Sequence, residues 1–123
     1  MDRETAWEGF AKAIEGHPFT TIEELKCDVD EGRATVVMGE NSAVVIRWHF
    51  AVGVAECAPA TGDPDEIVRD LRPVIEETCA DYGISEIYIQ AGRGAWSRLL
   101  RKHGYEEVAV ILRKVLRQSG PFN

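Results

Sequence analysis

This sequence lacks paired cysteines, long apolar runs and an excess of basic charge. Its three cysteines, Cys27, Cys57 and Cys79, are odd in number and widely spaced, with no C-x-x-C pair. We therefore expect neither a disulfide framework nor a zinc site. We expect a reducing, cytosolic setting instead. No apolar run approaches the roughly 20 residues that span a membrane, and the charged residues 2–8 do not resemble a signal peptide. We expect neither secretion nor membrane insertion.

The charge balance argues against nucleic acid as a partner. The chain has 14 Lys and Arg against 21 Asp and Glu, a formal net charge of −7, whereas phosphate neutralisation needs clustered basic residues. The basic residues are nevertheless uneven, with seven of the 14 in the last quarter: Arg93, Arg98, Arg101, Lys102, Arg113, Lys114 and Arg117. Such a basic end either meets a phosphorylated cofactor or an acidic partner, or is a solvated helix face.

Length and composition indicate one soluble domain spanning residues 1–123. A chain of 123 residues with 45% hydrophobic and 28% charged residues can bury a single core. Apolar spacing predicts helices over residues 3–15 and 20–32, the second with capping-box spacing from Thr20 and Thr21 to Glu23 and Glu24. The tail, 118–123, carries no pattern and is predicted to be loose.

A change to a period of two predicts the sheet. Residues 33–50 read as a hairpin that turns at Gly39-Glu40-Asn41, followed by a third strand, Val52–Ala58, and a loop over 59–62. A further strand is predicted over residues 85–91 and a last one over 105–116. A helix joins the third strand to 85–91, so these two strands should pair in parallel.

Helix signals are strongest from Asp63, a good N-cap, followed by Pro64 at a favoured first position. The helix should run to Gly83 and bend at Pro73. Its predicted buried stripe is Ile67, Leu71, Val74, Ile75, Cys79 and Tyr82. A last helix, 95–103, should bury Trp96, Leu99 and Leu100. The predicted class is α+β in three layers: a mostly antiparallel twisted sheet with one parallel pair, and helices on both faces.

Four short segments, in this order, carry a family resemblance: Gly32-Arg33-Ala34, Gly39-Glu40-Asn41-Ser42-Ala43, Gly62-Asp63 and Gly92-Arg93-Gly94-Ala95-Trp96-Ser97-Arg98. With the order of elements over residues 20–116, they resemble the GNAT superfamily of N-acyltransferases and, more narrowly, small GNAT-like proteins encoded among bacteriophage structural genes. The resemblance implies a GNAT-like fold. It also implies that acyl-CoA, if bound, lies between strands 52–58 and 85–91, with its pyrophosphate at the start of the next helix.

The sequence departs from that family where the coenzyme would bind. In the segment 58–66 only Gly62 matches the glycine-rich loop, because Pro59 and Pro64 lack N–H donors. Asp63, Asp65 and Glu66 place up to three negative charges where a diphosphate would sit.

The family's catalytic groups are also missing. Leu100 stands where active members carry a tyrosine general acid, and Arg93 stands where an Asn is common. Glu56, beside the expected gap, and His49 are the candidate general bases. A structural, exposed carboxylate is the simpler interpretation of Glu56.

Together with these departures, the resemblance implies a catalytically degenerate GNAT-fold protein that acts in virion structure or assembly, in the host cytoplasm or within the virion. Its expected partners are proteins, including other phage structural proteins, with no cofactor, nucleic acid or membrane. Arg93, Trp96 and Arg98 are the candidate partner-binding residues, although Trp96 on an apolar stripe also suits a core position. Gly62 and Arg93 are the candidate coenzyme-binding residues. The alternatives are an acetyl-CoA-dependent N-acetyltransferase with Glu56 as base and a phage-encoded inhibitor of a host protein.

Overall fold

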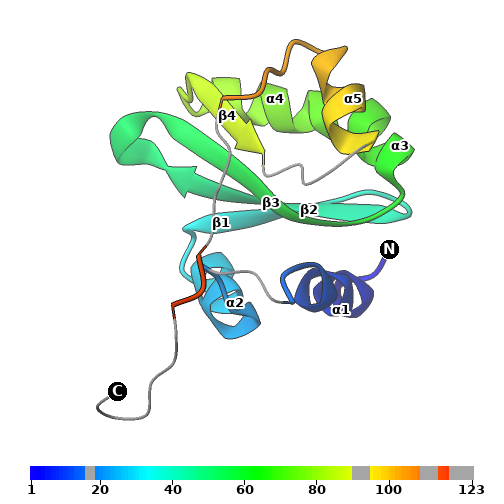
Figure 1. Ribbon diagram of the computed structural model, residues 1–123, viewed down its shortest axis with the longest axis vertical. Helices are drawn as coiled ribbons and strands as arrows, with labels where there is room; N and C mark the ends of the chain where they lie inside the picture. The colour runs from blue at the N-terminus through cyan, green and yellow to red at the C-terminus, as the bar shows by residue number, and fades with distance from the viewer. Residues whose placement is uncertain (16–18, 90–94, 109–113, 117–123) are drawn as a thin grey trace.

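A four-stranded mixed sheet lies between two layers of helices (Figure 1). The computed structural model describes residues 1–15, 19–89, 95–108 and 114–116. Strands β1 (Ala34–Met38), β2 (Ser42–His49) and β3 (Val54–Gly62) are antiparallel, and β4 (Glu86–Ile89) pairs in parallel with β3. The predicted α+β class, with one parallel pair and helices on both faces, is confirmed.

Two N-terminal helices, α1 (Arg3–Ala13) and α2 (Ile22–Asp30), cover one face of the sheet (Figure 1). Side chains cap both helices: Asp2 accepts a hydrogen bond from the Thr5 amide at 2.7 Å, and Thr21 accepts one from the Glu24 amide at 3.2 Å. Such caps satisfy amides that have no partner within the helix. The core on this face comprises Ala6, Phe10, Leu25, Ala34, Ala43 and Val45.

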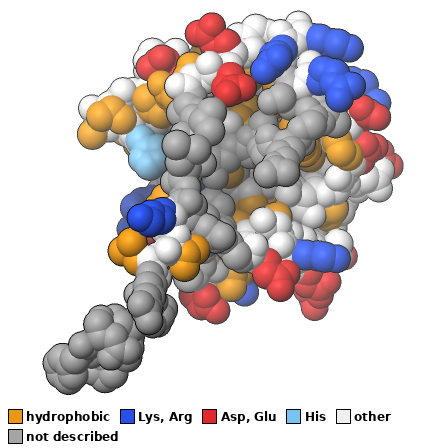
Figure 2. Space-filling model, in the orientation of Figure 1, with side chains coloured by type: hydrophobic (Ala, Val, Ile, Leu, Met, Phe, Trp, Pro, Cys, Tyr) orange, Lys and Arg blue, Asp and Glu red, His pale blue; other side chains and the backbone are white. Residues whose placement is uncertain are grey.

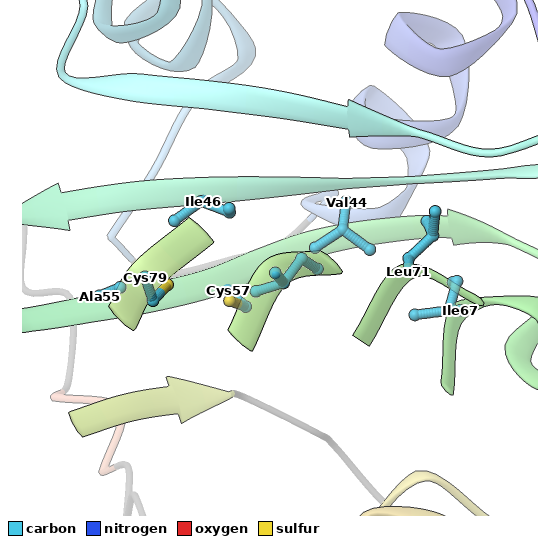
Figure 3. Packing of buried hydrophobic residues seen from close by; sticks show 8 residues of the cluster. Val44, Ile46, Ala55, Cys57, Ile67, Leu71 and Cys79 are labelled. Carbon is cyan, nitrogen blue, oxygen red and sulfur yellow. The ribbon is translucent and has the colours of Figure 1, made fainter. Parts of the chain in front are cut away.

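The other face is covered by an interrupted helix made of α3 (Pro64–Glu66), a π-helical segment (Ile67–Leu71) and α4 (Arg72–Asp81). The π-helical segment ends two residues before Pro73, which has no amide hydrogen and cannot sit within a regular α-helical ladder. The regular hydrogen-bond ladder is thus interrupted by a widened turn before Pro73, and the bend expected at Pro73 stays a prediction. The core on this face comprises Val44, Ile46, Ala55, Cys57, Ile67, Leu71, Ile75 and Cys79 (Figure 3).

Two residues of the predicted buried stripe on this helix are exposed, so their predicted burial is wrong. Val74 is 49% and Tyr82 61% exposed, so neither belongs to the core. Val74 precedes the buried Ile75 by one residue and therefore points away from it on the helix. Tyr82 lies beyond α4, where its ring contacts the partly buried Trp48 and the exposed Phe50.

The predicted third strand has the wrong bounds. β3 begins at Val54, after a short 3-10 turn over Phe50–Val52, and continues to Gly62. Residues 59–62, predicted as a loop, extend the ladder with β2: Ala60 pairs with Val44, Thr61 with Ala43 and Gly62 with Ser42. The pairing continues because the hairpin partner runs alongside β3 for its whole length.

The C-terminal part of the chain follows the prediction only in part. Helix α5 (Ala95–Arg101) is confirmed and buries Leu100. Of the predicted strand over 105–116, residues 105–108 and 114–116 have no strand structure, and residues 109–113 lie outside the described part. The predicted end of the preceding strand, at 90 and 91, also lies outside it.

Candidate functional site

A cavity of about 210 Å³ lies beside β3 and reaches both faces of the sheet. The parallel register joins Val54–Cys57 to Glu86–Ile89, and the cavity wall continues along β3 beyond that register, over residues 58–60. Its apolar lining comes from α1 and its end (Ala13, Ile14), from β2 and β3 (Val44, Cys57, Ala58, Pro59, Ala60), from the interrupted helix (Ile67, Val68, Ile75), and from Ile89, Trp96 and Leu100. A concave, mostly apolar site with a few polar groups is the usual form of a ligand pocket.

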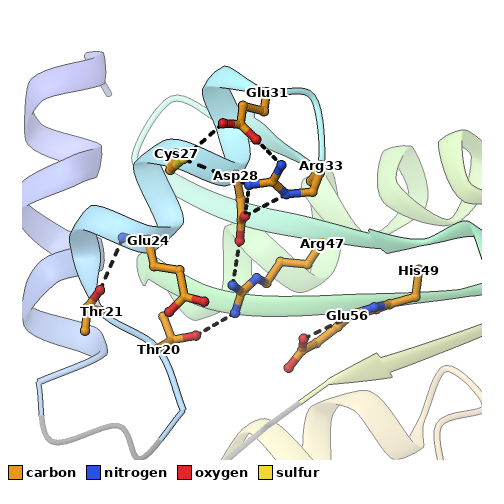
Figure 4. A network of polar contacts seen from close by, with 10 residues as sticks. All are labelled: Thr20, Thr21, Glu24, Cys27, Asp28, Glu31, Arg33, Arg47, His49 and Glu56. Atoms are coloured by element: carbon orange, nitrogen blue, oxygen red, sulfur yellow. Dashed lines mark hydrogen bonds and ion pairs between the residues drawn. The ribbon is translucent and has the colours of Figure 1, made fainter.

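Arg47 supplies positive charge to the wall on the α1 and α2 face. Its guanidinium donates to Thr20 Oγ1 at 2.6 Å and to Asp28 Oδ2 at 2.7 Å (Figure 4). The hydrogen bond from Arg47 to Asp28 has the largest effect in holding the pKa of Asp28 below its ordinary value, and Arg33, paired with Asp28 at 2.9 Å, lowers it further. The Arg47 charge is thus largely compensated by Asp28, and this ion pair links α2 to β2.

On the opposite face, Arg72, Glu76 and Tyr105 form a second polar group. Arg72 Nη1 pairs with Glu76 Oε1 at 2.9 Å, and the Tyr105 hydroxyl donates to Glu76 Oε2 at 2.9 Å. Burial, followed by the hydrogen bond to the Glu76 carboxylate, raises the pKa of Tyr105. Tyr105 therefore remains a neutral phenol at physiological pH. From the sequence, Tyr105 was predicted only as the start of the strand 105–116; its position four residues after the end of α5 was the one local signal that it could reach a cavity wall beside that helix.

The predicted general base, Glu56, does line the cavity. Its carboxylate lies 3.6 Å from His49 Nε2, so the two candidate bases lie beside each other (Figure 4). The next residue, Cys57, is buried, and this burial raises the pKa of its thiol to about 12. A thiol with so high a pKa is not a nucleophile at neutral pH.

The start of α3, where a coenzyme pyrophosphate was expected, is already occupied by the protein. The Asp63 side chain accepts the Asp65 amide at 3.0 Å, and Pro64 has no amide hydrogen. Gly62 has a φ of +98°, and a Cβ there would lie 2.1 Å from the carbonyl oxygen of Asn41. This close approach of two backbones explains why a glycine occupies position 62. A role of Gly62 in coenzyme binding stays a prediction.

Glu66 requires a correction. The sequence placed its carboxylate among the charges facing a diphosphate, but the side chain is only 5% exposed and points to the turn between β1 and β2. It accepts hydrogen bonds from the Glu40 amide at 3.1 Å, from the Asn41 amide at 2.9 Å and from the Ser42 hydroxyl. The negative charge at the helix start therefore comes from Asp63 and Asp65 alone.

The candidate residues around α5 separate into different environments. Leu100 is buried in the cavity wall, and Trp96 is partly buried against the core beside it. Arg98 is exposed. Arg93 lies outside the described residues, so its predicted roles stay predictions.

No protein-family model matches the sequence, and no curated protein does either. Among the described residues, no group of three or more His, Cys, Asp or Glu side chains is placed to hold a metal ion. In the same part of the chain, every helix is too short or too polar to cross a membrane.

Proposed function

We propose that this chain is a GNAT-like binding protein that has lost acyl transfer and acts through protein–protein contacts. The observation that carries the proposal is the start of α3. There Pro64 has no donor, and Asp63 both occupies the Asp65 amide and adds negative charge. A diphosphate at this position would find no free amide donor at residues 64 and 65 and would be repelled by the carboxylates. Both effects weaken anion binding.

The position of Leu100 supports the same proposal. A buried leucine cannot protonate a departing thiolate, and it fills the wall where the resemblance expects a phenol. The resemblance to proteins encoded among phage structural genes supports a role in virion structure or assembly.

Calorimetric titration with acetyl-CoA is the direct test. We expect no binding heat from the folded protein. Micromolar binding that disappears with an analogue lacking the diphosphate would overturn the proposal. The variant Asp63→Ser, Pro64→Ala restores an uncharged cap and one donor, and a gain of binding in this variant alone would identify the helix start as the lost site.

The cavity supports a second candidate function, acyl transfer. It lies beside the parallel pair of strands, and Glu56, with the phenol of Tyr105, lines its wall. A base and a neutral phenol are the two proton-transfer groups that amine acylation requires. Thiol release from acetyl-CoA over a panel of amines tests it: activity that falls at least tenfold in both Glu56→Gln and Tyr105→Phe would support acyl transfer, and no thiol release would exclude it for those amines.

A further inference from the structure

Three aromatic rings form a cluster at the end of the sheet where β2 turns into β3, with Phe50 and Tyr82 exposed and Trp48 partly buried against the core. Trp48 and Phe50 stack with ring centroids 5.4 Å apart and planes 5° from parallel, and Tyr82 meets Trp48 edge-on at 5.2 Å. Phe50 is 56% and Tyr82 61% exposed. Trp48 is also held by a hydrogen bond from Nε1 to Thr35 Oγ1 at 2.9 Å. We call Trp48, Phe50 and Tyr82 the aromatic tip.

The aromatic tip is suited to recognition because its rings are positioned in advance. Mutual packing and the Trp48 hydrogen bond already restrict the side chains. Binding a partner therefore costs little additional side-chain entropy. Exposed aromatic rings of this kind supply much of the binding energy at protein interfaces. The hydrophobic effect disfavours leaving them in water.

Acidic side chains accompany the aromatic tip. Asp81 directly precedes Tyr82, Glu77 lies one helical turn earlier, and Glu86 pairs in register with Val54 at the start of β3. All three are exposed and, within the described residues, none forms an ion pair. Figure 2 shows red side chains next to orange ones at the end of the molecule where Figure 1 places the β2–β3 turn. A complementary partner would be basic.

The chain carries such a surface at its other end. Arg98, Arg101 and Lys102, on α5 and directly after it, are exposed. Arg101 pairs with Glu107 at 3.5 Å, with both side chains more than half exposed, which leaves that charge largely open to solvent. Blue side chains gather at the end of the molecule where α5 lies, away from the β2–β3 turn (Figures 1 and 2). We call Arg98, Arg101 and Lys102 the basic ridge.

We propose that the aromatic tip of one copy of this chain binds the basic ridge of a second copy, head to tail. The inference rests on the proposed function, since it names the partner in a protein–protein contact. Guanidinium groups stack on aromatic faces and are attracted by the ring quadrupole, while the acidic neighbours pair with the remaining basic charge. This charge complementarity is the reason for choosing a second copy over an unrelated partner.

The geometry of such a contact has a consequence for assembly. The two surfaces differ, so each bound copy keeps one unused tip and one unused ridge. A contact of this kind closes into a ring or extends into a filament, and does not stop at a symmetric dimer. Self-association of this type suits a component of a virion.

Sedimentation equilibrium of the full chain tests the proposal. The mean mass should rise with concentration beyond that of a dimer and fall with added salt, because salt screens the charges of the exposed ridge. Phe50→Ser and the double variant Arg98→Glu, Lys102→Glu should each weaken association about tenfold or more. Thermal unfolding followed by circular dichroism checks that both variants remain folded.

Mixing the two variants provides the sharpest outcome. The tip variant keeps its ridge and the ridge variant keeps its tip, so the mixture can form one intact contact. At a concentration where each variant alone is mostly monomeric, the mixture should yield a 1:1 heterodimer. Two controls should associate like the wild type: Phe19→Ser, which removes a 67% exposed Phe outside the tip, and Arg3→Glu, Lys12→Glu, which reverses two charges on α1.

Three results would overturn the head-to-tail contact: a wild-type chain that stays monomeric up to millimolar concentration, variants that associate like the wild type, or a mixture that stays monomeric. None of them bears on coenzyme binding, because Phe50, Arg98 and Lys102 do not line the cavity among its described residues. A monomeric protein that gives no heat with acetyl-CoA would leave the proposed function standing and remove this inference alone.

Discussion

Glu66 and Asn41, 25 residues apart in sequence, are joined by a hydrogen bond of 2.9 Å from the Asn41 amide to Glu66 Oε2. The same carboxylate also accepts from the Glu40 amide and the Ser42 hydroxyl, so one buried side chain fixes the β1–β2 turn to the start of the interrupted helix. A buried carboxylate is stable only when hydrogen bonds replace its hydration. Glu66 is thus a structural clamp.

Removing this clamp should destabilise the fold strongly. Glu66→Ala leaves two amides and a hydroxyl without their acceptor, and we expect a loss of about 3 kcal/mol in the free energy of unfolding. Urea unfolding measures it. The control is Asp65→Ala, one residue earlier and exposed, which should cost less than about 1 kcal/mol. Equal losses for the two variants would contradict the clamp.

Gly62 and Gly83 form a matched pair of substitutions. Both have positive φ, +98° and +75°, but a Cβ on Gly62 meets the Asn41 carbonyl at 2.1 Å, whereas a Cβ on Gly83 has nothing within 4 Å. Gly83→Ala should therefore cost about 1 kcal/mol from backbone strain alone. Gly62→Ala adds a clash between two backbones and should cost about 3 kcal/mol or more. If the two losses match in thermal unfolding, the close approach at Gly62 is not rigid.

Tyr105 should make the free energy of unfolding depend on pH in the alkaline range. Folding raises its pKa, so its contribution to stability is complete below the unfolded value of about 10 and is lost as pH rises from there towards the folded pKa. Tyr105→Phe should lose about 1–2 kcal/mol at neutral pH and lack this alkaline decline. Urea unfolding at neutral pH and above pH 10 measures both effects.

Ultraviolet absorbance gives an independent check of Tyr105. The rise in tyrosinate absorbance on bringing the folded protein to pH 11 should be the same for the wild type and for Tyr105→Phe, because Tyr105 stays protonated. A larger rise in the wild type would show that its pKa is not raised.

The three cysteines should react with thiol reagents in two classes. Cys27 is exposed, whereas Cys57 and Cys79 are buried, and burial raises the pKa of both buried thiols. We expect one reactive thiol per native chain and three in denaturant, counted with a chromogenic disulfide. Cys27→Ser should leave no fast-reacting thiol in the native state. Rapid reaction of Cys57 in that variant would mean that the cavity admits the reagent to β3.

The sequence was most informative where local chemistry decides structure. Capping residues located the starts of α2 and α3, apolar spacing located α1, and alternation located β1 and β2, because these signals depend on neighbours within a few residues. The length of β3 was missed because residues 59–62 are held by β2, a partner that no local pattern reveals. The exposure of Tyr82 was missed for a related reason: its contacts are Trp48 and Phe50, which precede it by more than 30 residues.

In the candidate site, too, some features follow from the sequence and others from the tertiary structure. Asp63, Pro64 and Leu100 are fixed by the sequence itself, and the structure keeps Asp63 and Pro64 at the start of α3 and buries Leu100. Only the tertiary structure directed the Glu66 carboxylate to the β1–β2 turn, placed the Tyr105 phenol on Glu76 and brought Tyr82 to the rings of Trp48 and Phe50. A side chain's chemical type is fixed by the sequence, but its partner is chosen by packing across the sheet, and that choice depends on the whole chain at once.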